Sequence, residues 1–199
     1  MATLTAKLRD AGYTVHSRQL PAVGNPNPPS DLSADIAAVR ALVEEAIGDE
    51  GNDVVVVPHS WAGILAGSAL TGLGKKEREA AAGGGRKDPY VHAKDANIFY
   101  NDLPESEKQH WFSQLQSHSL ATFYTPATAA SWKEIPTSYL LCEDDQAIPA
   151  AGQEAMIAGV KDLGGVIEVT RLKASHSPFL SRPEETVEWI RRAAGEEGI

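Results

Sequence analysis

The feature that most constrains the fold of this chain is the stretch DVVVVPHSWAGILAG at residues 53–67. Four consecutive valines without polar alternation are typical of a strand that is buried on both faces of a parallel sheet. Small residues follow, and they favour a helix that approaches the strand closely. The stretch therefore predicts a strand at 53–59, a sharp turn with Ser60 at its tip, and a helix at 61–72.

Helix and strand patterns alternate along the rest of the chain. Apolar residues spaced three and four apart predict helices, and short β-branched runs predict strands. This alternation is typical of an α/β architecture. The predicted strands lie at 13–20, 135–145 and 166–172, and the predicted helices at 2–11, 32–47, after 104, 149–165 and from 183 onward.

Local signals refine these helices. Ser181 and Glu184 are spaced as in a capping box at the start of the last helix, which turns Val187 and Ile190 inward. The glycine-rich residues 74–88 predict a helix tail that runs into a flexible linker. One buried stripe is predicted on the second helix, made of Leu32, Ile36, Val39, Val43 and Ile47.

Composition fits a single soluble domain and excludes some partners. The 199 residues are 42% hydrophobic, which suffices for one core. A formal net charge of −9 argues against nucleic acid or an anionic membrane surface, since both attract positive charge. The single cysteine, Cys142, excludes an internal disulfide. No signal peptide and no run of about 18 apolar residues is found, so a cytoplasmic protein is expected.

Three loops carry residues that could act together in catalysis. Ser60 stands at a helix N-terminus, where the helix dipole and free N–H groups favour negative charge. Asp144 and Asp145 come at the end of the strand at 135–145, and His176 comes just after the last predicted strand. All therefore lie at the carboxyl ends of strands, where open α/β sheets bind ligands. Taken singly, each residue also has an ordinary explanation as a helix cap, a solvated turn or a plain loop residue.

The segments VVVVPHSWAGILAG, YLLCEDDQAIP and ASHSPFLSRPEETVEWI resemble the α/β-hydrolase fold superfamily, and most closely its branch of methyl-ester esterases and hydroxynitrile lyases. The chain order Ser, Asp, His is the order of that scaffold. Matched motif to motif, Ser60 takes the place of the nucleophile and His176 that of the general base. Asp145, four residues before Pro149, takes the place of the acid, with Asp144 as the alternative.

The resemblance implies a truncated α/β-hydrolase fold, with a mostly parallel sheet flanked by helices, in a single domain at 1–199. Residues 89–131 take the place of a small helical cap. The Trp61 N–H is the expected oxyanion donor. The residues implied to line the substrate pocket are His59, Trp61, Trp111 and Phe179. For Trp61 and the cap aromatics, packing in an ordinary core is the alternative.

The match departs from the family pattern in three places. Pro58 stands where a glycine is commonest. The chain begins after the position of the family's first strand, whose loop supplies the second oxyanion donor, and RKDPYVHAKDAN replaces an apolar strand after the elbow helix. Losing one oxyanion donor costs about 10²–10³ in rate. Buried valines without neighbouring strands imply that the other strands close up, that a partner chain supplies them in a homodimer, or that the protein is poorly stable. A divergent family member and a shortened gene model both stay open.

The pattern as a whole predicts a serine hydrolase that acts on a small carboxylic ester without a cofactor. The histidines lack metal-ligand spacing, and no glycine-rich phosphate loop follows a predicted strand. A small-molecule ester is the expected partner. Two alternatives stay open: a hydroxynitrile lyase-like enzyme that uses the same triad, and a catalytically impaired homologue that binds an apolar ligand or a partner chain.

Overall fold

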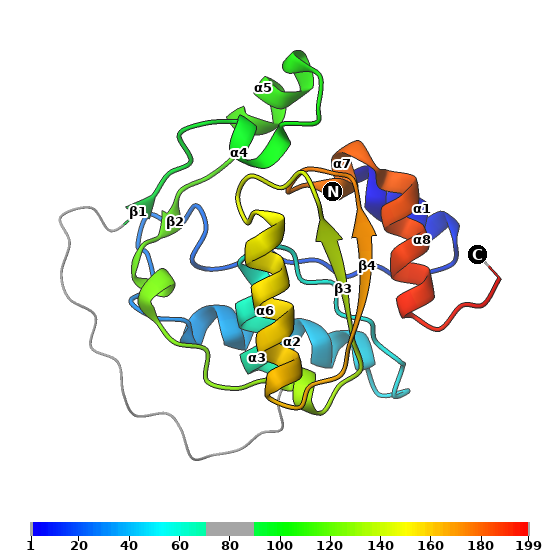
Figure 1. Ribbon diagram of the computed structural model, residues 1–199. Helices are drawn as coiled ribbons and strands as arrows, with labels where there is room; N and C mark the ends of the chain where they lie inside the picture. The colour runs from blue at the N-terminus through cyan, green and yellow to red at the C-terminus, as the bar shows by residue number, and fades with distance from the viewer. Residues whose placement is uncertain (1, 71–89, 199) are drawn as a thin grey trace. The chain divides into compact units, whose positions relative to one another are not determined.

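The computed structural model describes residues 2–70 and 90–198, and these residues form two compact units. The predicted linker at 74–88 lies outside the described residues. Each unit has its own small sheet and its own helices (Figure 1). Unit 1 contains residues 2–15, 95–114 and 135–198, and unit 2 contains residues 16–70, 90–94 and 115–134.

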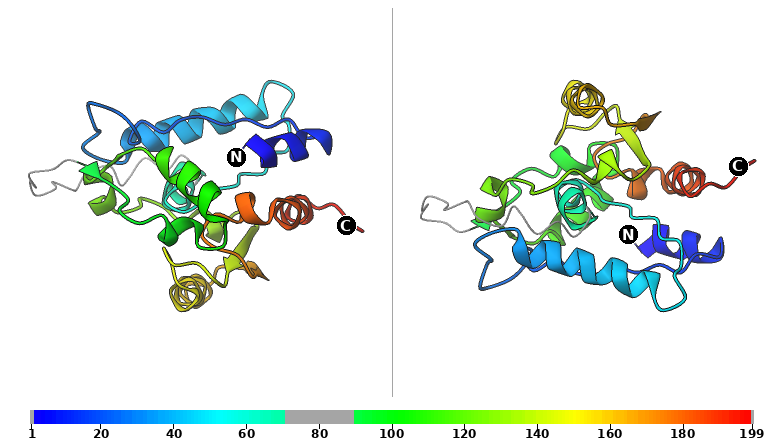
Figure 2. Two further views of the ribbon diagram at one scale, coloured as in Figure 1. Left: turned by 90° about the horizontal axis from the view of Figure 1, so that it is seen from above. Right: turned by 90° about the horizontal axis from the view of Figure 1, so that it is seen from below.

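Unit 1 is built on a parallel pair of strands, β3 (Thr137–Cys142) and β4 (Ile167–Leu172). The helix α6 (Ala150–Asp162) connects them, because a parallel pair needs a crossover. Figure 2 shows α6 on one side of the strands and α8 (Pro183–Ala193) on the other. Gly164 follows α6 with a φ of +83°, in the left-handed region. The two predicted strands and the crossover helix of this unit are confirmed.

The main apolar cluster of unit 1 lies between α1 (Ala2–Asp10) and α8. Gly12, with a φ of +94°, ends α1, and the Tyr13 N–H donates to the Leu8 carbonyl at 3.0 Å. The predicted first helix and the inward positions of the last helix are therefore confirmed. The buried members of the cluster are Leu4, Leu8, Val187 and Ile190.

The capping box predicted at the last helix is wrong. Ser181 is the final residue of α7 (Pro178–Ser181), and Arg182 occupies the N-cap of α8 without a side-chain cap hydrogen bond. Pro178 begins α7 and Pro183 begins α8, as suits a proline in a first helical turn. Ser181 therefore lies at the end of α7, and Arg182 is the residue just before α8. Glu184 pairs with Lys7 Nζ at 2.7 Å.

Unit 1 also includes α4 (Asn97–Tyr100) and α5 (Glu105–Ser113), which confirms the helix predicted after residue 104. Residues 115–131, which complete the predicted cap, belong to unit 2. The predicted cap is thus divided between the units. Its role as one lid, and the arrangement of the chain as one domain, stay predictions.

Unit 2 combines two packed helices with a short antiparallel pair of strands. The helix α2 packs against α3, and β1 pairs with β2. The helices predicted on either side of the valine run are confirmed within the described residues. Of the predicted stripe only Leu32 is buried; Ile36, Val39 and Val43 are half-buried, and Ile47 is 40% exposed at the end of α2. The elements of unit 2 are α2 (Ser33–Ile47), α3 (Ala62–Leu70), β1 (Tyr90–Val91), β2 (His118–Ser119), η1 (Ala121–Tyr124) and η2 (Ser131–Lys133).

Two predicted strands, at 13–20 and 53–59, do not form, and the prediction is wrong for both. A strand needs a neighbour for its N–H and C=O groups. Within the part of the chain that the structure describes, neither segment has such a neighbour in a sheet. Val55 and Val57 are each 44% exposed instead of buried. Among the described residues, the valine run therefore leads into the turn at Ser60 without a sheet around it.

Leu8→Ala tests the core between α1 and α8. We expect the free energy of unfolding to fall by about 2–5 kcal/mol, because the substitution removes buried methyl groups and leaves a cavity. Leu163→Ala is the control, because Leu163 is 65% exposed, and it should change the free energy by less than about 0.5 kcal/mol. Urea unfolding followed by circular dichroism measures both variants, and equal stabilities would contradict the assigned core.

Candidate active site

Ser60 lies at a turn with a strained backbone. Its φ is +54°, and it is the only non-glycine residue with a positive φ among the described residues. Such a conformation costs about 1–3 kcal/mol and persists where the surrounding structure imposes it. A strained, exposed serine between an extended segment and a helix has the geometry of a nucleophile elbow. The predicted turn is therefore confirmed.

Backbone hydrogen bonds hold this turn. The N–H groups of Ala62 and Gly63 donate to the carbonyls of His59 and Ser60 at 3.1 and 3.0 Å, so α3 starts directly after the serine. N–H groups in the first turn of a helix have no acceptor within the helix. The Trp61 N–H donates to no acceptor in the described part of the chain. It is therefore available to a negative charge that develops beside Ser60.

The Trp61 ring packs in unit 2 against two other rings. It stacks on Phe123 with 4.4 Å between the ring centroids, and His118 meets it edge-on at 5.4 Å. The His118 Nε2 lies 3.2 Å from the Thr122 Oγ1, and burial lowers the pKa of His118. Packing of the half-buried Trp61 ring against neighbouring rings is thus observed, and its role in a substrate pocket stays a prediction.

The predicted acid and histidine form a buried pair in unit 1. Asp145 follows β3, His176 follows β4, and the Asp145 Oδ2 lies 2.9 Å from the His176 Nδ1. Each side chain is only 6% exposed. The other carboxylate oxygen, Oδ1, accepts the N–H groups of Ala147 and Ile148 at 2.8 and 2.9 Å. A carboxylate held in this way orients the imidazole.

Asp144, the alternative acid, has a different role. Its side chain is exposed, and its N–H donates to the Ala174 carbonyl at 3.1 Å. This backbone bond ties the acid loop to the histidine loop. Asp144 thus links the two loops, and Asp145 supplies the carboxylate that meets the imidazole.

Gln153 on α6 holds the acid loop and was not among the predicted site residues. It is 2% exposed, and its amide accepts the Cys142 N–H at 3.1 Å and donates to the carbonyls of Cys142 and Ile148 at 2.8 and 2.7 Å. The Glu143 N–H donates to the Leu172 carbonyl of β4. The backbone groups of Cys142, one residue earlier, therefore face the opposite edge of β3. The Gln153 amide therefore makes, at this edge of β3, the hydrogen bonds that a neighbouring strand would make. A polar residue at an inward position of α6 was the one signal for it.

The other predicted pocket residues are half-buried. Trp111 on α5 contacts the His110 ring edge-on at 5.0 Å, and Phe179 packs against the apolar cluster of α1 and α8. His59 precedes Ser60 in unit 2. Phe99 was not predicted, yet its ring lies 5.4 Å from the His176 ring in unit 1.

The structure brings Asp145 and His176 together within unit 1. Ser60 and Trp61 belong to unit 2, and their approach to that pair stays a prediction. In the ranges 2–70 and 90–198, no group of three or more His, Cys, Asp or Glu side chains could hold a metal ion. Within the same ranges, no helix has the length and apolar character needed to cross a membrane.

Cys142, a free cysteine, is unsuited to act as a nucleophile. Burial, together with the nearby charges of Asp145 and Asp102, raises the pKa of its thiol to about 12. The thiolate is the reactive form of cysteine, and a thiol with this pKa stays protonated at neutral pH. The hydroxyl of Ser60 is therefore the stronger candidate.

Comparison with known proteins identifies the family of this chain. The sequence profile described as the Alpha/beta hydrolase family matches residues 1–189. Probable hydrolase R7 of a Phoma species is 31% identical over 226 residues, which cover 98% of this chain and 92% of that protein. The chain belongs to the alpha/beta hydrolase family. It is a hydrolase, and the predicted fold class is confirmed, with two-stranded sheets in the described part of the chain.

Two further proteins are similar to this hydrolase. Alpha/beta hydrolase nvfD of Aspergillus novofumigatus is 28% identical over 97% of this chain and 90% of that protein. The crystal structure of polyneuridine aldehyde esterase shares the fold with a TM-score of 0.71, at 16% identity over 97% of this chain and 92% of that chain. The alignment with nvfD spans 229 residues, more than the 199 of this hydrolase. That relative therefore contains segments inside the aligned region that have no counterpart here.

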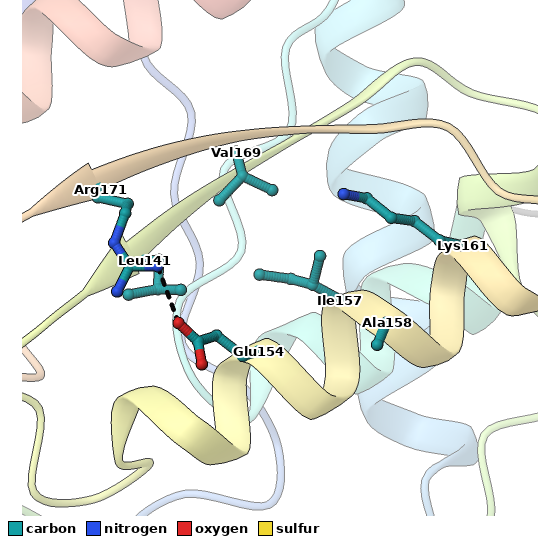
Figure 3. Close-up of a pocket in the computed structure, with 7 residues that line it drawn as sticks. All are labelled: Leu141, Glu154, Ile157, Ala158, Lys161, Val169 and Arg171. Carbon is teal, nitrogen blue, oxygen red and sulfur yellow. Dashed lines mark hydrogen bonds and ion pairs between the residues drawn. The ribbon is translucent and has the colours of Figure 1, made fainter.

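A hollow of about 280 Å³ lies between α6 and the strands β3 and β4 of this hydrolase (Figure 3). The Arg171 Nη1 donates to the Glu154 Oε1 at 2.9 Å on one side, and Lys161 lines the other side. Its described lining contains none of the predicted site residues. The hollow is a gap in the packing of α6 on the strands, and it is separate from the acid–histidine pair.

Gln153→Leu tests how the acid loop is held. We expect the free energy of unfolding to fall by about 2–4 kcal/mol, because buried backbone groups of Cys142 and Ile148 lose partners worth about 1–3 kcal/mol each. Gln109→Leu is the matched control, since the exposed Gln109 amide contacts only the Glu105 carboxylate at 2.8 Å among the described residues. Chemical unfolding measures both, and similar losses would show that Gln153 does not hold the loop.

Ser60→Gly and Ser60→Ala test the strain in the turn. The glycine variant should be the more stable by about 1 kcal/mol, because glycine enters the left-handed region without a Cβ clash. At Ser68 on α3 the order should reverse, with glycine about 1 kcal/mol less stable than alanine in a helix. Both Ser68 variants lose the hydroxyl that accepts the Thr128 N–H, so that loss cancels. The same order at both positions in thermal unfolding would argue against strain at Ser60.

Proposed function

We propose that this hydrolase is a serine esterase for small carboxylic esters, with Ser60 as nucleophile, His176 as general base and Asp145 as the acid that orients it. The observation that carries the proposal is the buried 2.9 Å hydrogen bond between the Asp145 Oδ2 and the His176 Nδ1. With Nδ1 engaged, Nε2 is the ring nitrogen that exchanges a proton with the nucleophile. The name of the structural neighbour polyneuridine aldehyde esterase agrees with this reaction class.

The proposed reaction has two halves. The Ser60 Oγ attacks the carbonyl carbon of the ester while its proton moves to the His176 Nε2. The tetrahedral intermediate then expels the alcohol, which takes that proton, and an acyl group remains on Ser60. Water attacks this acyl group, giving its proton to His176, and the carboxylic acid leaves as Ser60 regains its proton. No cofactor takes part.

The oxyanion of both intermediates is assigned to the Trp61 N–H. This group follows the nucleophile directly and donates to no acceptor among the described residues. Loss of one donor from an oxyanion hole costs about 2.7–4 kcal/mol, or about 10²–10³ in rate. With a single assigned donor, the enzyme should prefer esters with good leaving groups, such as p-nitrophenyl acetate.

A fluorophosphonate probe, which reacts with activated serines, tests the nucleophile. We expect the wild-type protein to be labelled, Ser60→Ala to stay unlabelled, and Asp145→Asn to react about 10⁴-fold more slowly, because the imidazole loses its orientation. Ser113→Ala is the control and should react like the wild type, since the Ser113 hydroxyl lies on α5 and donates to the His110 carbonyl at 2.7 Å. Intact-protein mass spectrometry gives the labelled fraction with time.

Folded wild-type protein that stays unlabelled would contradict the esterase. It would favour a second candidate, a homologue that binds a small apolar ligand without turnover. That candidate draws support from the valine run at 53–59, which has no sheet partner among the described residues. Labelling at Ser60 with cleavage of a cyanohydrin and no ester turnover would point instead to a hydroxynitrile lyase-like reaction.

A further inference from the structure

Residues 99–102, with the sequence FYND, contact both loops that carry the acid–histidine pair. We call them the FYND segment. It runs from the last turn of α4 toward α5, within unit 1. In sequence it lies more than 40 residues from the acid loop and more than 70 from the histidine loop. Only the tertiary structure therefore places it beside the pair.

The FYND segment fixes the residue just before the histidine. Ser175 is 0% exposed, and its N–H donates to the Asp102 Oδ2 at 2.8 Å. The Ser175 hydroxyl donates to the Phe99 carbonyl at 3.2 Å. A hydrogen bond to a carboxylate is roughly twice as strong as one between neutral groups. Asp102 thus holds the backbone one residue away from the imidazole, and the Phe99 ring lies 5.4 Å from that imidazole.

The same segment fixes the residue just before the acid. The Asn101 Nδ2 donates to the Asp144 carbonyl at 2.9 Å. The Asp144 N–H in turn donates to the Ala174 carbonyl of the histidine loop at 3.1 Å. Asp145 and His176 are therefore each preceded by a residue that is bound to the FYND segment.

The Asp102 carboxylate is only partly hydrogen-bonded. Its second oxygen, Oδ1, is buried and has no hydrogen-bond partner among the described residues. Its charge also contributes to the raised pKa of the Cys142 thiol at the end of β3. A carboxylate with one buried oxygen left unpaired among the described residues lowers stability, so packing alone does not account for Asp102 at this position.

We propose that Asp102 is a positioning residue, which holds the histidine loop so that the His176 imidazole meets Asp145 in the catalytic geometry. The proposal rests on the proposed esterase for its catalytic meaning. An error of about 1 Å in the placement of a catalytic group can cost about 10²-fold in rate. Asp102 acts on the reaction only through the Ser175 backbone.

Asp102→Ala in the full chain tests the proposal with two readouts. The first is the downfield proton NMR signal of the proton between His176 Nδ1 and Asp145, which should be lost or broadened. The second is ester turnover, in which kcat should fall about 10²-fold with KM nearly unchanged, because substrate binding is left intact. Asp102→Asn, which keeps an oxygen for the Ser175 N–H, should retain the signal and most of the turnover.

The control is Asp95→Ala at the other end of α4, where the Asp95 carboxylate accepts the Asn97 N–H at 2.9 Å. It should leave the NMR signal and kcat unchanged. If Asp102→Ala fails to fold, Asp102→Ser is measured instead, and it should weaken the signal because the shorter side chain does not reach the Ser175 N–H as the carboxylate does. A folded Asp102→Ala, or Asp102→Ser in its place, with a wild-type signal and wild-type kcat would overturn the proposal.

The NMR readout separates this proposal from the esterase itself. It reports on the hydrogen bond between Asp145 and His176, does not require Ser60, and can be recorded in a Ser60→Ala background. If Ser60 is not the nucleophile, the fluorophosphonate labelling fails, but the effect of Asp102→Ala on the NMR signal is still expected. If labelling depends on Ser60 while Asp102→Ala leaves the NMR signal and kcat unchanged, the esterase is supported and the positioning role is wrong.

Discussion

The hydrogen bond between Asp145 and His176 is the interaction on which the candidate site depends. It joins two loops that follow different strands, and both side chains are almost fully buried. Parallel pairing of β3 and β4 brings the carboxyl ends of these strands to one edge, so the loops start side by side. The second oxygen of Asp145 binds two N–H groups of its own loop, which leaves the carboxylate little freedom to turn.

The surroundings of the pair consist of side chains that bind backbone groups. Gln153 ties the end of β3 to the acid loop, and Asp102 and Asn101 bind the residues before the histidine and the acid. The contacts of Gln153 and Asp102 satisfy backbone groups that burial would otherwise leave unpaired, and the contact of Asn101 adds a bond to the exposed Asp144. In unit 2, the turn at Ser60 is held by the first hydrogen bonds of α3 and by the packing of the Trp61 ring.

Much of this could be predicted from local patterns. The motif Asp-x-x-Ile-Pro favoured Asp145 over Asp144, and the structure gives Asp145 the bond to the imidazole. The strand predicted from the valine run was wrong, because four valines indicate a buried strand only where neighbouring strands exist. Val55 and Val57 are instead each 44% exposed. The capping box at Ser181 failed because α7 already contains that serine. The error at the valine run came from missing neighbours in a sheet, whereas the error at Ser181 had a local cause.

The sequence by itself determined the residue types at the site, their order and their places at the ends of elements, since turn, strand and helix signals act over a few residues. It also determined that Ser60 would stand at a turn before a helix. Only the tertiary structure decided that Asp102, 73 residues from Ser175, and Gln153, 11 residues from Cys142, would hold the loops. Contacts between a side chain and a distant backbone group leave no periodic pattern in a sequence. They depend on how the strands and helices pack, which is a property of the folded chain.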